Sequence, residues 1–89
     1  MTSAVLEATQ SLVEKDAFGI VISVIAGQEA GSKAVLDDSG EIIAGSLPHR
    51  VAESARVDAL ALMSRETSST LAYGEDELFF EVIAPRPRL

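Results

Sequence analysis

The chain has 89 residues, 47% of them hydrophobic and 24% charged, which is the size and composition of one small globular domain. Its formal net charge of −7 disfavours binding to nucleic acids and to anionic membranes, because both are negatively charged. The chain contains no cysteine, which excludes disulfides, thiolate metal sites and cysteine nucleophiles and favours a cytoplasmic location.

The N-terminal part predicts a helix followed by a central strand. Residues 2–15 carry apolar side chains at helical spacing, and Thr2 or Ser3 can cap this helix. The N-terminal residues contain neither a basic region nor a long apolar stretch, so a signal peptide is not expected. Residues 18–26 are rich in β-branched residues and apolar on both faces, which is typical of a strand covered on two sides.

The middle of the chain predicts a hairpin and a second helix. Strands at residues 33–36 and 41–44 flank the turn sequence Asp37-Asp38-Ser39-Gly40. Ser46 is the expected N-cap of a helix over residues 47–64, with Pro48 in its first turn. Five side chains make the apolar stripe of this helix: Val51, Ala55, Ala59, Leu62 and Met63.

The last elements complete an α/β domain of the α+β type. Strands are expected at residues 67–73 and 78–84, so the order is α-β-β-β-α-β-β. We expect one domain over residues 1–84, with two helices and a mixed sheet of about five strands, and a Pro/Arg tail or truncated linker at 85–89. Residues 18–26 and 78–84 should be the most buried strands. Short exposed edge strands and a thin core favour a homodimer.

The segment from Gly45 to the start of the second helix is the best candidate for a ligand site. Free backbone N–H groups and the helix dipole at such a strand-to-helix junction favour an anion. Ser46 can donate a hydrogen bond, His49 can add a donor, and Arg50 can grip a phosphate or carboxylate with two bonds. The structural alternative is that Ser46 only caps the helix and that Arg50 pairs with Glu53.

Other polar clusters have simpler explanations. The glycine-containing loop at residues 27–33 could cradle a phosphate with Lys33, but it lacks the P-loop spacing and serves equally well as a connection between strands. Acidic turns at Asp37-Asp38 and at residues 75–77 match no calcium loop. The single histidine and the lack of a nucleophile motif argue against a metal site and against an enzyme.

Several segments together resemble one known family. Residues 18–24, 31–36 and 38–46, Tyr73-Gly74 before an acidic turn, and residues 81–85 are similar to the N-terminal domain of the XdhC/CoxI family. The resemblance covers most of the chain, from Asp16 to Pro85. Two family segments differ here. The family has further glycines and a cysteine where this chain has residues 47–50, and a glycine-rich, cysteine-containing segment where it has residues 74–77.

The resemblance implies an accessory role in the maturation of molybdenum hydroxylases such as xanthine dehydrogenase. It implies transient handling of the molybdenum cofactor (molybdopterin) through Gly45, Ser46, His49 and Arg50, or contact with the partner enzyme, and no tightly bound cofactor. The chain shows no dinucleotide fingerprint of the family's C-terminal nucleotide-binding-type domain. Because the family's cysteines are missing, this chain is not expected to carry out a step of cofactor sulfuration that depends on them. The missing cysteines also favour the alternative of an interaction or oligomerisation module without a ligand site.

Overall fold

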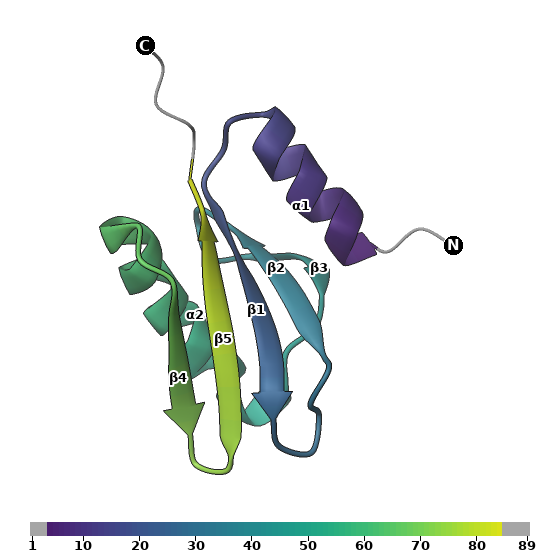
Figure 1. The fold of residues 1–89 in the computed structure, drawn as a ribbon, viewed down its shortest axis with the longest axis vertical. Helices are drawn as coiled ribbons and strands as arrows, with labels where there is room; N and C mark the ends of the chain where they lie inside the picture. The colour runs from purple at the N-terminus through teal and green to yellow at the C-terminus, as the bar shows by residue number, and fades with distance from the viewer. Residues whose placement is uncertain (1–3, 85–89) are drawn as a thin grey trace.

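The computed structural model describes residues 4–84, which form two helices and five strands (Figure 1). The α+β class and the element order are confirmed, and every element lies within two residues of its predicted bounds. The proposed caps at Thr2 and Ser3 and the proposed tail at residues 85–89 lie outside the described residues. The elements are α1 (Ala4–Glu14), β1 (Gly19–Ala26), β2 (Lys33–Asp37), β3 (Ile42–Gly45), α2 (His49–Arg65), β4 (Ser69–Tyr73) and β5 (Asp76–Ile83).

The five strands form one sheet in the order β3-β2-β1-β5-β4. All four neighbouring pairs are antiparallel, whereas a mixed sheet was expected. For three of these four pairs the reason is connectivity. Short connections join β1 to β2, β2 to β3 and β4 to β5, and a short connection produces an antiparallel pair. The helix α2 carries the chain from one edge of the sheet to the other, and β5 then returns beside β1.

The larger core lies between α2 and one face of the sheet. The predicted stripe of α2 is buried as expected, and it packs on alternate residues of β1, β2 and β5. Ile20, Ile22 and Phe80 are among the fully buried side chains of this layer. Small alanines at positions 55 and 59 have no exposed surface, which allows α2 to lie close to the strands.

A smaller core lies between α1 and the opposite face. Leu12 of α1, Val21 of β1 and Val35 of β2 form its buried centre. The first half of β1, from Gly19 to Ile22, is therefore covered on both faces, as predicted, whereas Ser23 is half-buried and Ile25 is exposed. The strand β5 was expected to be, with β1, one of the two most buried strands, and this is wrong: buried and exposed residues alternate from Asp76 to Glu81, so one of its faces is open along this stretch, and β2 is more completely buried. Neither helix of the described residues is long and apolar enough to cross a membrane.

The turn between β2 and β3 forms as its sequence predicts. The carboxylate of Asp37 accepts hydrogen bonds from the backbone N–H groups of Ser39 at 2.9 Å and Glu41 at 3.0 Å. The Ser39 hydroxyl, which also donates to Asp37, contributes most to lowering the pKa of that carboxyl. Arg56 of α2 donates to the carbonyl of Gly40 at 2.8 Å, so the turn is also tied to the helix.

Candidate functional site

Gly45 ends β3 at a point where the backbone of β2 comes very close. Its φ is +74°, and a Cβ atom at this position would lie 2.0 Å from the carbonyl oxygen of Lys33. The next residue, Ser46, donates its backbone N–H to that same oxygen at 3.0 Å. The glycine is therefore required by the packing of β3 against β2.

Ser46 does not cap α2, contrary to the prediction. The N-cap is Pro48, which makes no side-chain capping bond, and the helix begins at His49. Leu47 packs against the core and Pro48 is buried, so these two residues fix where the chain enters the helix. Proline at the N-cap lacks a side-chain acceptor, and Ser46 lies two residues before the N-cap position, too early to supply one. Both Ser46 and His49 are exposed.

Arg50, in the first turn of α2, is held by two carboxylates. Its Nε donates to Oδ2 of Asp76 at 2.9 Å, and its Nη2 donates to Oδ1 of Asp76 at 2.8 Å. Its Nη1 lies 3.3 Å from Oε2 of Glu29. The predicted partner, Glu53, is not the one observed. Three of the five N–H donors of the guanidinium are thus already engaged.

Asp76 is the residue that sequence analysis missed at this site. It is only 4% exposed, and it is the first residue of β5. A buried carboxylate needs a cationic partner, and Arg50 supplies it with a bidentate pair. The hydrogen bond from Arg50 holds the pKa of Asp76 below its usual range, and the same bond raises the pKa of Arg50. The alternation of Asp76 with Leu78 and Phe80 was the available sequence signal, because it places Asp76 on the covered face.

A hollow of about 360 Å³ lies beside this ion pair. Tyr73 forms part of its wall, and the Tyr73 hydroxyl donates a hydrogen bond to Asp58 of α2. Burial, followed by the hydrogen bond to this carboxylate, raises the pKa of Tyr73, so the phenol remains a donor well above neutral pH. The lining is polar and bears more carboxylates than cations: Gln28, Arg50, Tyr73, Gly74, Glu75 and Asp76.

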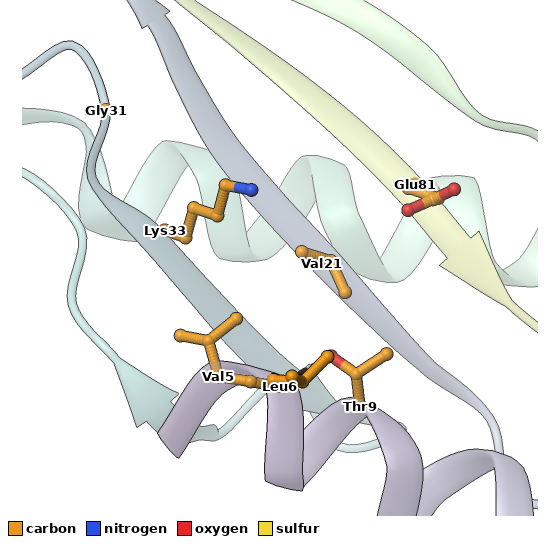
Figure 2. A pocket seen from close by; sticks show the side chains of 7 residues that line it. All are labelled: Val5, Leu6, Thr9, Val21, Gly31, Lys33 and Glu81. Atoms are coloured by element: carbon orange, nitrogen blue, oxygen red, sulfur yellow. Dashed lines mark hydrogen bonds between the residues drawn. The ribbon is translucent and has the colours of Figure 1, made fainter. Parts of the chain in front are cut away.

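The loop between β1 and β2 does not form a phosphate cradle. The N–H of Ala30 donates to Gly27, that of Gly31 to Val24, and that of Ser32 to Glu29. These three N–H groups donate to nearby backbone carbonyls, so they are not available to bind a common anion. Lys33 lies on the face of the sheet covered by α1, with the residues drawn in Figure 2, and α2 covers the other face. The structure therefore does not bring Lys33 together with Arg50.

The acidic turns do not combine into a metal site. Within residues 4–84 no group of three or more histidine, aspartate and glutamate side chains is placed to hold a metal ion. The carboxylate of Asp37 is engaged by its own turn, and Asp76 is engaged by Arg50.

No protein-family model matches the chain, and no curated protein matches its sequence.

Proposed function

We propose that this chain is a non-enzymatic accessory module of the XdhC/CoxI type that works in the cytoplasm by binding a protein. The partner enzyme of such a module is a molybdenum hydroxylase. One observation favours protein binding over cofactor binding: the guanidinium of Arg50 is already bonded to the carboxylates of Asp76 and Glu29. The lack of cysteine supports both a reducing compartment and a role without sulfur transfer.

The electrostatics of residues 45–50 argue against a phosphate there. An anion that approached Arg50 would have to compete with two carboxylates already bonded to it. Asp76 cannot turn away into solvent, because it is buried and its removal from Arg50 would leave an unpaired buried charge. The net charge of this cluster, one cation and two anions, is negative.

The cofactor-handling alternative is tested by direct binding. The purified chain is incubated anaerobically with molybdenum cofactor and ultrafiltered, and protein-bound molybdenum and pterin are measured. We expect no retention. Arg50→Ala alone would leave Asp76 unpaired, so the matched variant is the double substitution Arg50→Ala with Asp76→Ala. Retention by the wild type that this double variant abolishes would overturn the choice and assign the cofactor to residues 45–50.

Association into a homodimer is a second proposal, and the β4 edge of the sheet supports it. The sequence of β4, from Ser69 to Tyr73, contains no charged residue and no proline, and its register with β5 is unbroken. The opposite edge strand, β3, is shorter and has a register shift against β2. Bulges, charges and prolines are the usual protection of sheet edges, and β4 has none of them. Such an edge can pair with the same edge of a second copy.

Sedimentation at micromolar concentrations tests the dimer. We expect the wild type to sediment as a dimer and Ala72→Lys, which places a charge on the β4 edge, to sediment as a monomer. Ala30→Lys, in the exposed loop between β1 and β2, is the control and should remain dimeric. A wild-type monomer across this range would contradict the proposal.

A further inference from the structure

The face of the sheet that carries α1 is only half covered. On the opposite face α2 packs on β1 and β5, whereas α1 packs chiefly on β2 and β3 (Figure 1). Five strands spaced about 4.8 Å apart make a face roughly 24 Å wide, and a helix with its side chains is about 10 Å across. The face therefore has room for a second helix beside α1, over β1, β5 and β4.

The uncovered half has an apolar centre. Phe79 of β5 lies opposite Ser23 of β1 and Thr70 of β4, and it is 37% exposed. Ile25, which is 51% exposed, lies beside Glu77 at the register shift between β1 and β5. The other described aromatic side chains are buried or half-buried. An exposed phenylalanine near the middle of a sheet is a typical anchor for a binding partner.

A groove of about 460 Å³ lies beside α1 on the same face of the sheet (Figure 2). Val5, Leu6 and Thr9 of α1 form one wall, and Val21 of β1 lies between the helix and β5. Glu81 stands on the far side from α1 in this view. Glu81 lines this groove and lies two positions from Phe79 on the same face of β5, so the groove borders the surface around Phe79.

Charge selects among the possible occupants. Exposed carboxylates of Glu77 and Glu81 stand on either side of Phe79 along β5, and a cation that lines the groove, Lys33, lies farther off on β2. A second copy of this chain, whose net charge is −7, would bring acidic groups against these carboxylates, and so would an anionic membrane. Lysine and arginine side chains on a partner would instead pair with them.

We propose that this surface, defined by Ile25, Glu77, Phe79 and Glu81 and called here the β5 face, binds a basic amphipathic helix of a partner protein. Apolar side chains of the helix, spaced by three and four residues, cover Phe79 and Ile25. Its lysine or arginine side chains pair with Glu77 and Glu81. The proposal rests on the role of the chain as a protein-binding module and names the surface that performs it.

Selection from a displayed library tests the β5 face. Random peptides of about 16 residues, long enough for about four helical turns, are selected on the immobilised wild-type chain. We expect the enriched sequences to carry an apolar helical stripe flanked by lysine or arginine. Fluorescence anisotropy of the synthesised peptides should show affinity reduced about tenfold or more by Phe79→Ser, a loss typical of an interface anchor. Glu81→Lys should also weaken binding, and the loss should diminish as salt is raised.

The control substitution is Val57→Ser, because Val57 is an exposed apolar residue on α2, on the other side of the sheet. It should leave peptide affinity unchanged, and circular dichroism should show native folding in all three variants. The proposal is overturned if no peptide is enriched, if the enriched peptides are acidic, or if they bind Phe79→Ser as tightly as the wild type. A dimer that Phe79→Ser dissociates would reassign the face to self-association. Cofactor retention at Arg50 would refute the proposed function while leaving these peptide results intact.

Discussion

Alanine substitutions at Gly45 and Gly74 separate backbone strain from steric contact. The two glycines have similar φ angles, +74° and +64°. A Cβ at Gly45 would lie 2.0 Å from the carbonyl oxygen of Lys33, whereas nothing lies within 4 Å of a Cβ at Gly74. Both alanines must adopt a left-handed conformation, which costs roughly 1–2 kcal/mol. Only the alanine at position 45 must also displace a neighbouring strand, which adds roughly 1–3 kcal/mol.

These costs translate into different unfolding temperatures. In a domain of this size, 1 kcal/mol shifts the midpoint of thermal unfolding by about 4–8 °C. We expect Gly74→Ala to lower the midpoint by roughly 4–16 °C and Gly45→Ala to lower it by roughly 8–40 °C, with the larger shift at position 45. Thermal unfolding followed by circular dichroism measures both. Equal shifts would refute the argument that Gly45 is required by the contact with β2, and would leave a role in ligand approach open for it.

Three further predictions follow from buried groups. The pKa of Asp76 is lowered in the folded chain, so its contribution to stability is present above its unfolded pKa of about 3.9 and is lost as pH falls through the lower folded value. Asp76→Asn should be less stable than the wild type at neutral pH, because Arg50 loses its charged partner, and it should lose less stability on acidification in unfolding experiments between pH 7 and pH 2. Phe80→Ala should lower the free energy of unfolding by about 3–5 kcal/mol, because Phe80 has no exposed surface. Phe79→Ala should lower it by less than about 1 kcal/mol. Denaturant titration of both variants measures the difference. Tyr73 is the only tyrosine, so the phenolate absorbance reports it alone, and ionisation should begin above the ordinary pKa of about 10; a midpoint at that ordinary value would contradict its burial against α2.

Features determined by neighbouring residues could be predicted from the sequence. The turn after Asp37 depends on contacts within five residues, and the structure forms it as expected. The apolar stripe of α2 and the two-sided cover of β1 from Gly19 to Ile22 also follow from local patterns, and both are confirmed. The burial of β5 was overestimated because its apolar residues were judged by their number, whereas Glu77, Phe79 and Glu81 alternate onto an uncovered face.

Features determined by distant residues could not be predicted. Arg50 and Asp76 are 26 positions apart, and only the folded sheet brings the start of β5 to the start of α2. The expected pairing with Glu53 followed helical spacing, which cannot take account of a carboxylate from another element. The cap at Ser46 was wrong for a related reason, because the burial of Pro48 in the core, and not local capping chemistry, sets the start of α2.

The position of β5 beside β1 has a consequence for the order in which this domain assembles. Ile20 pairs with Val82, so the two central strands are roughly sixty positions apart along the chain. The β1–β2 pair can form early, since only a short loop must close, but the second edge of β1 stays open until α2 and β4 have crossed the sheet. Folding should therefore be slow for a domain this small, and the open apolar edge of β1 is the point at which a partly synthesised chain is most exposed to aggregation.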